Sequence, residues 1–269
     1  MLVIPLFGLI LALYAWPVIN ILWLGVSDPE LGIQNYELLF TKSSLVKILW
    51  TTTRVCLITT LFSVMIGYLI AYTMVHLVGR ERNLMLTLVL ISFWVSVLVR
   101  AFSWLTLLGR NGLVNAVLVG SGMTEEPISM IRNEFGVLVG MIHYMVPYAV
   151  LPLLANMQGI DHRIMDASRS LGAGPLLTFM RIYLPLTKPG VIASSLLVFI
   201  ISLGFYVTPA LLGGGRVLMV AEYVSVQILV TVQWGVAAML ATLLLSGVFA
   251  LLYIMSRFMK IGDVFGARP

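Results

Sequence analysis

Three side chains that could carry charge or protons lie within or at the ends of long apolar stretches of this sequence: Arg54, Arg100 and His143. Placing a charged group at the centre of a membrane costs roughly 2.5 to 3.5 kcal/mol on insertion scales, so each one needs a structural or functional reason. Both arginines fall near the ends of their stretches. We therefore expect them to reach the interface or to pair with an acid such as Glu222. We expect His143 to be a packing histidine.

The apolar stretches lack the groups that catalysis needs. They contain no Asp or Glu, no His-Glu-x-x-His and no Gly-x-Ser-x-Gly, so we predict no catalytic residue and no enzyme. The glycine run before Arg216 lacks the Lys-Ser/Thr of a phosphate-binding loop, and ATP hydrolysis would have to come from another chain. The single cysteine, Cys56, excludes a disulfide or a cysteine-based metal site within the chain, and we predict no bound metal.

Composition identifies the solvent as lipid. Of the 269 residues, 60% are hydrophobic and 10% are charged, whereas soluble domains usually carry about 25% charged residues. The net charge of +5 is scattered and forms no basic run, which argues against nucleic acid as a partner. We expect an all-α integral membrane protein, made of one transmembrane domain over residues 1–269.

Charge-free stretches predict six transmembrane helices, because about 20 apolar residues cross the hydrocarbon core. The N-terminal stretch has no basic lead and is too long for a signal peptide, so it is expected to be retained. The remainder of the charge-free run after Glu222, residues 223–233, is expected to be an outer or re-entrant helix. The six expected spans are Leu2–Val26, Val55–Val75, the segment from Arg82 to Leu108, Phe135–Gln158, Pro189–Leu212 and Trp234–Ser256.

Basic residues predict that both termini are cytoplasmic. With six spans, the loops on the side of the termini hold nine Lys and Arg residues, and the opposite loops hold five. Cytoplasmic loops carry the excess of Lys and Arg, so this count supports the orientation. The largest predicted cytoplasmic feature is the loop 159–188.

The loop 159–188 has the pattern of two short amphipathic helices. Ile164, Ala167, Ser168 and Leu171 share one face at helical spacing, and Gly172 follows as a stop. Gly174-Pro175 then begins a second piece. Such a pair lies either in the lipid interface or in a groove of a partner, and composition leaves both open.

The spacing within this loop resembles the coupling loop of binding-protein-dependent ABC importer permeases. That family's signature is Glu-Ala-Ala, three residues, Gly, nine residues and Ile-x-Leu-Pro. Here Asp166-Ala167-Ser168, Gly172 and Ile182-x-Leu184-Pro185 stand at those spacings, with Asp for Glu and Ser for the second Ala. Residues 31–40 and 204–214 are similar to segments of the spermidine/putrescine-type permeases.

The resemblance implies a type I ABC importer permease in the bacterial inner membrane. Its expected partners are an ABC ATPase dimer, a second permease subunit that is a different chain, and a periplasmic substrate-binding protein. ATP and Mg would bind the ATPase, with no cofactor on this chain. The cargo would be a small cationic or amine-containing solute of the polyamine, γ-aminobutyrate or opine type. The alternatives are a phosphonate, metal or vitamin permease, and a secondary transporter or channel.

The resemblance also implies two sets of site residues. The ATPase-coupling set comprises Asp166, Ala167, Ser168, Gly172 and Ala173, with Ile182, Leu184 and Pro185 anchoring the loop on the membrane bundle. For a cationic cargo, we expect the pathway to be lined by aromatic rings and hydroxyls that offer cation–π contacts or hydrogen bonds. These pathway candidates are Tyr144, Phe205, Tyr206, Thr208 and Trp234.

Overall fold

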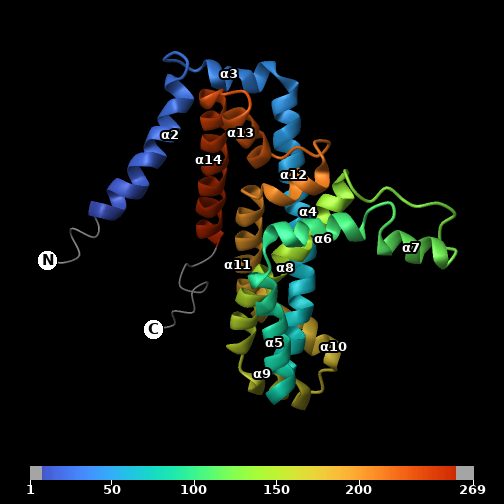
Figure 1. Ribbon diagram of the computed structural model, residues 1–269. Coiled ribbons are helices and arrows are strands. Elements are labelled where there is room, and N and C mark those ends of the chain that lie inside the picture. Colours follow the sequence, from blue (N-terminus) through green and yellow to red (C-terminus); the bar gives the residue numbers. More distant parts are fainter. Residues whose placement is uncertain (1–7, 259–269) are drawn as a thin grey trace. The chain divides into compact units, whose positions relative to one another are not determined.

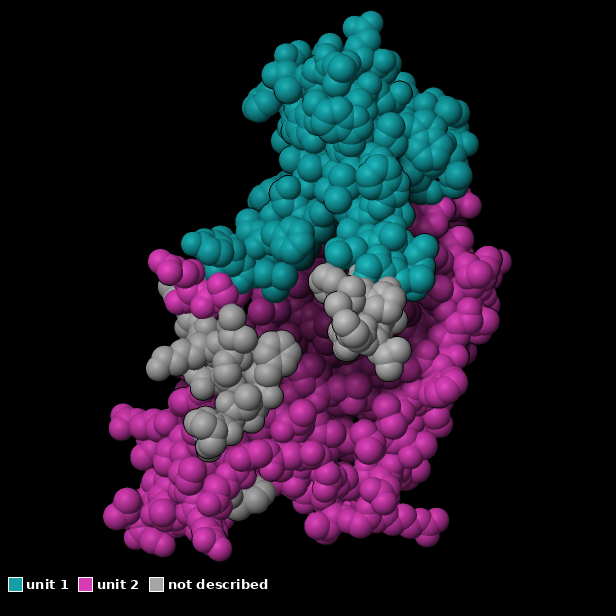
Figure 2. Space-filling model, turned by 90° about the vertical axis from the view of Figure 1, so that its left-hand side faces the viewer, with its two compact units in different colours: residues 1–53, 218–254 teal, residues 54–217, 255–269 magenta. Residues whose placement is uncertain are grey.

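The computed structural model describes residues 8–258, and every regular element within that range is a helix (Figure 1). The first residues of the predicted N-terminal span and both chain ends lie outside the described residues. The chain divides into two compact units, residues 1–53 with 218–254 and residues 54–217 with 255–269 (Figure 2). Each unit is described by itself below.

Five helices are long and apolar enough to cross a membrane, and a bent pair brings the number to six within the described residues. The five are Gly8–Ser27, Ser43–His76, Glu134–Gln158, Pro175–Leu203 and Trp234–Arg257. The bent pair is α5 (Gly79–Trp94) with α6 (Val97–Leu107), which meet at 97°. The prediction of an all-α protein is confirmed.

The first unit is built on α2 (Trp16–Ser27), α3 (Gln34–Thr41), the start of α4 (Ser43–His76), α13 (Val220–Leu229) and α14 (Trp234–Phe258). A π-helical turn, Leu11–Ala15, precedes α2. Leu45, Val220, Met239 and Leu240 form a fully buried core. The Thr52 hydroxyl accepts from the Val220 amide at 2.9 Å, which satisfies one of the free amides at the start of α13.

The second unit packs helices closely around α8 (Glu134–Gln158). It contains the rest of α4, α5, α6, α7 (Leu113–Gly120), α9 (His162–Ser170), α10 (Pro175–Thr178), the π-helical turn η2 (Phe179–Tyr183), α11 (Leu184–Leu203) and α12 (Val207–Gly213). Small residues permit the close contacts, as is usual between membrane helices. A Cβ on Gly140 of α8 would lie 2.5 Å from the Leu212 side chain of α12. Ser194 of α11 donates to the Ala149 carbonyl of α8 at 3.0 Å.

The predicted third span, from Arg82 to Leu108, is not one straight helix. It breaks at Val95 and Ser96, and the buried Arg100 side chain donates to the carbonyls of Ser92 and Val95 at the end of α5. The last carbonyls of a helix have no partner within that helix, so a guanidinium is suited to cap them. The cause of the bend is therefore a side chain. The segment contains no glycine or proline from which a bend could be predicted.

Pro185 lies inside a continuous helix. Residues 175–203 run without interruption through α10, η2 and α11. Pro185 has no amide to close an α-helical turn. The helix is wider just before it, because the Leu184 amide bonds the Phe179 carbonyl, five residues earlier, in a π-turn. The predicted fifth span, Pro189–Leu212, therefore begins earlier than expected and ends at Leu203, before α12.

Candidate functional site

Helix α9 is the central element of the predicted coupling loop, and local signals fix both of its ends. The Asp161 side chain caps its start by accepting from the Arg163 amide at 2.9 Å. At its end, Gly172 has φ +86°, the Gly172 amide bonds the Arg169 carbonyl at 2.9 Å and the Ala173 amide bonds the Ser168 carbonyl at 3.2 Å. These two bonds and the left-handed glycine form a Schellman motif.

Two residues of α9 face the unit's own interior. Met165 and Ser168 are buried, and the Ser168 hydroxyl bonds the buried Thr178 hydroxyl of α10 at 3.0 Å. This bond ties the two short helices together. Ser168 was predicted in the coupling set, and the structure places it on the inward side.

The surface of α9 that adjoins Ser168 is exposed and apolar. Ile164 is 44% exposed, Leu171 is 89% exposed and Ala167 is also exposed. Asp166 is also exposed, in a loose ion pair with Arg169, with the charged atoms 3.8 Å apart and both side chains in solvent. We call the surface formed by Ile164, Ala167 and Leu171 the α9 face.

The predicted anchor residues enter the membrane helix through η2. Ile182 packs against the core of the second unit, which includes Tyr183 and Met165. Leu184 and Pro185 stand one turn further on, with outward side chains. In Figure 1, α9 and α10 lie at the end of this unit where α5 begins.

The structure brings together two of the five predicted pathway residues. The rings of Tyr144 in α8 and Phe205, just after α11, lie 4.5 Å apart. Arg100 lies over the face of Tyr144, 4.8 Å from its centroid, and Tyr148 stacks on Tyr144 at 5.6 Å. Sequence reasoning missed Tyr148, although its spacing of four from Tyr144 places both on one helix face.

The other three pathway candidates have separate environments. Thr208 is buried where α12 meets Gly140 of α8, so it packs helices. Tyr206 is exposed at the start of α12. Trp234 begins α14 in the first unit, and about half of its surface is exposed.

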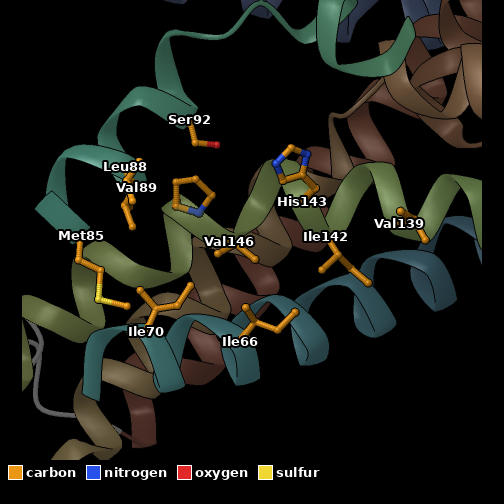
Figure 3. Close-up of a pocket in the computed structure, with 11 residues that line it drawn as sticks. Ile66, Ile70, Met85, Leu88, Val89, Ser92, Val139, Ile142, His143 and Val146 are labelled. Carbon is orange, nitrogen blue, oxygen red and sulfur yellow. The ribbon is translucent and has the colours of Figure 1, made fainter. Parts of the chain in front are cut away.

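His143 was expected to be a packing histidine, and the structure gives it a hydrogen-bond partner but leaves the residue exposed. The Trp104 indole donates to His143 Nδ1 at 3.1 Å. The ring also borders an open, mainly apolar cavity of about 560 Å³ between α4, α5 and α8. Figure 3 shows Ile66 and Ile70 of α4 across this cavity from Met85 and Val89 of α5, with the ring of His143 and the hydroxyl of Ser92 above them.

Two acidic residues, Glu134 and Glu222, differ in whether their carboxylates have a partner. Arg54 pairs with Glu134 at the start of α8, so an arginine does pair with an outer acid, although not with Glu222. Glu222 is buried in the first unit, and one of its carboxylate oxygens has no partner among the described residues. Burial raises the pKa of this carboxyl, and the Met219 amide partly offsets the rise. Among the described residues, no group of three or more His, Cys, Asp or Glu side chains gathers to hold a metal.

The amino-acid sequence matches a known protein family and named relatives over most of its length. The family described as "Binding-protein-dependent transport system inner membrane component" matches residues 63–260. The Haemophilus influenzae spermidine/putrescine transport system permease protein PotB is 33% identical over 202 residues, covering 75% of this chain and 70% of the relative. The Escherichia coli protein of that name is 31% identical over 209 residues, covering 77% and 76%.

Solved structures show the same fold. A bacterial ABC transporter involved in the import of alginate superposes with a TM-score of 0.74 at 17% identity, covering 96% of this chain and 95% of that one. The bacterial alginate ABC transporter in complex with a pentasaccharide-bound periplasmic protein gives 0.76 at 17% identity, covering 96% and 94%. The chain therefore belongs to the family of binding-protein-dependent transport system inner membrane components, and it is a multi-pass permease subunit of an ABC importer.

Proposed function

We propose that this permease transports a small aliphatic amine of the spermidine/putrescine type, and that a separate ATPase drives it by docking on the α9 face. The observation that carries the docking part is the exposure of that face. Fully burying a Leu or Ile side chain contributes about 1.5 to 3 kcal/mol, so covering Ile164 and Leu171 offers a substantial gain to a partner with a matching cleft. Because hydrogen bonds cap both ends of α9, the helix can transmit a movement of the ATPase to the membrane helices as a rigid element.

Membership of the family supports the other partners that we propose. The ATPase dimer would hold ATP and Mg, and this chain would hold neither. A second, different permease subunit would complete the pathway, and a periplasmic binding protein would deliver the cargo, as in the solved complex of the alginate transporter with its periplasmic protein. Both termini and the loop 159–188 would lie in the cytoplasm. The domain is taken as residues 1–269, with the coupling set Asp166, Ala167, Ser168, Gly172, Ala173, Ile182, Leu184 and Pro185.

The names of the relatives support an amine cargo. Two PotB permeases at 31% and 33% identity are named for spermidine and putrescine transport. Within this chain, the exposed ring of Tyr206 and the half-buried ring of Phe205 offer faces to an ammonium group. The face of Tyr144 is already covered by Arg100, so it is a weaker candidate.

Arg100 favours a second candidate cargo, an amine that also carries a carboxylate, such as γ-aminobutyrate or an opine. Its guanidinium is buried, and its Nε atom has no hydrogen-bond partner among the described residues. A carboxylate would satisfy that donor and balance the charge, whereas a polyamine would be repelled by it. The two cargoes would therefore interact differently with Arg100: the carboxylate of an amino acid would pair with it, and a polyamine would not.

Uptake into proteoliposomes tests the proposal. The permease would be reconstituted with its ATPase, partner permease and binding protein, and uptake of radiolabelled putrescine, spermidine and γ-aminobutyrate would be measured with and without ATP. We expect ATP-dependent uptake of putrescine or spermidine, and its loss in Gly172→Asp with normal insertion. Gly122→Asp is the matched control, because Gly122 also has positive φ and open surroundings but lies in the loop 109–134. Normal uptake by Gly172→Asp would sink the docking proposal, and uptake of neither amine would sink the cargo.

A further inference from the structure

A cavity of about 230 Å³ lies beneath the coupling helix. The end of α4 supplies Tyr72 and His76, α9 supplies Met165, Asp166 and Arg169, and the following segment supplies Pro175, Thr178, Phe179 and Tyr183. All of these residues belong to the second unit. The cavity is on the opposite side of α9 from the α9 face, because Met165, Asp166 and Arg169 line it and helical spacing places these three residues across the helix from that face.

Three aromatic rings form a corner in this cavity. The Tyr72 ring stands nearly perpendicular to those of Phe179 and Tyr183, with centroids 5.7 and 5.4 Å away. Phe179 and Tyr183 are close to parallel, 5.9 Å apart. Aromatic faces carry partial negative charge and attract cations, and cages of this kind recognise organic ammonium groups.

The polar groups of the cavity also favour a cation. His76 Nδ1 is bonded to the Tyr72 carbonyl at 2.8 Å, so it donates there, and the other ring nitrogen of the neutral imidazole is left as an acceptor. The Tyr183 side chain is 5% exposed, and its hydroxyl has no hydrogen-bond partner among the described residues. Asp166 adds a carboxylate at the rim.

One group opposes a cation. Arg169 also lines the rim, and its loose contact with Asp166, at 3.8 Å and in solvent, competes for that carboxylate. Exposed pairs of this kind are weak, so a ligand cation that also contacts the half-buried rings of Tyr72 and Phe179 can displace it. An anion would find Arg169 as a charged donor at the rim, but it would face aromatic rings that repel it.

We propose that this cavity binds a small aliphatic ammonium ion from the cytoplasm, and that the bound ion holds α9 against α4 and slows the importer. The inference rests on the proposed function for the cytoplasmic placement of the loop and for the amine as cargo. The site is separate from the docking surface, since it lies under the helix whose outer face meets the ATPase. Accumulated cargo would in this way limit its own uptake.

Direct binding is the first test. Equilibrium dialysis of radiolabelled putrescine would be done with the purified full complex, without the binding protein. In Tyr72→Leu we expect binding weaker by roughly two- to thirtyfold, because one cation–π face is lost. In Arg169→Gln we expect tighter binding, because the competing cation is gone. Phe249→Leu, which removes an exposed ring of α14 in the first unit, is the control and leaves the affinity unchanged.

Inhibition is the second test. In proteoliposomes with the ATPases outward, external putrescine should inhibit ATP hydrolysis, with the inhibitory concentration shifted upward in Tyr72→Leu and downward in Arg169→Gln. The uncharged diol of the same chain length and succinate should not inhibit. Weaker binding in Arg169→Gln, unchanged binding in Tyr72→Leu, or equal inhibition by the diol would overturn the inference. If putrescine binds as described but is not transported, the cargo proposal fails and the site stands; if it is transported without this binding, only the site fails.

Discussion

Replacing Gly172 should uncouple ATP hydrolysis from transport without unfolding the protein. Gly172 has φ +86°, and a Cβ built on it would meet nothing within 4 Å. The effect of a side chain is therefore conformational and not steric. An L residue in the left-handed region costs roughly 1 to 2 kcal/mol, and a β-branched residue is the least tolerated.

That cost acts on the Schellman motif that ends α9. A change of about 1 to 2 kcal/mol alters a two-state ratio by a factor of about 5 to 30. If the wild-type protein favours the capped conformation by a similar free energy, Gly172→Val should reduce that conformation to about half of the molecules or fewer. Gly172→Asn should be milder, because asparagine tolerates the left-handed region. The direction of α9, and with it the α9 face, would then vary from molecule to molecule.

The assay is the ratio of cargo transported to ATP hydrolysed in proteoliposomes. We expect this ratio to fall strongly in Gly172→Val, less in Gly172→Asn and not at all in Gly122→Val, whose glycine has φ +73° in the loop 109–134 and equally open surroundings. The thermal midpoint should fall by a similar few degrees in Gly172→Val and Gly122→Val, because valine has the same left-handed cost at both positions. A wild-type ratio in Gly172→Val, or an equal loss in Gly122→Val, would refute the reasoning.

Three further outcomes concern stability. Ser168→Ala should destabilise by about 1 to 3 kcal/mol in unfolding measurements, because the buried Thr178 hydroxyl loses its partner, and a simultaneous Thr178→Val should recover part of this; no recovery would contradict the pairing. Gly140→Ala should lower the thermal midpoint through overpacking against Leu212, at a cost of about 1 to 3 kcal/mol, and an unchanged midpoint would show that α8 and α12 can separate. Glu222→Gln should raise the midpoint at about pH 8 and not at about pH 4. Burial raises the pKa of this carboxyl, so the stability it contributes is present below its usual pKa and is lost as pH rises through the folded value; a lower midpoint for the variant at high pH would contradict this.

Local signals in the sequence placed the elements around the coupling loop well. The stop at Gly172 was predicted from the sequence, and Asp161, which caps the start of α9, is a local signal that the prediction did not use. Helix α14 was also located closely, since a span of about 20 residues counted back from Arg257, the end of the charge-free run, begins near Trp234. The type of element and its ends depend here on neighbours in sequence.

Other features depended on contacts between distant residues. The predicted span Val55–Val75 is part of the longer α4, because charge counting stopped at Arg54, whereas the helix continues through threonines whose hydroxyls bond their own backbone, as Thr53 does to Leu49. The bend between α5 and α6 depends on Arg100 folding back to carbonyls of the preceding helix. No pattern in the segment carries that information.

The two departures from the family signature in the coupling loop have different consequences. Ser168 replaces an alanine, and it is buried, facing Thr178, where its hydroxyl has a partner inside this chain. An alanine there would leave the Thr178 hydroxyl without this bond, so the serine is explained by internal packing and need not alter the surface offered to an ATPase. Asp166 replaces a glutamate on an exposed side of the helix, where its side chain lies 3.8 Å from that of Arg169. The shorter carboxylate is therefore the one departure that can change a contact with a partner, and it is also the one that borders the aromatic cavity.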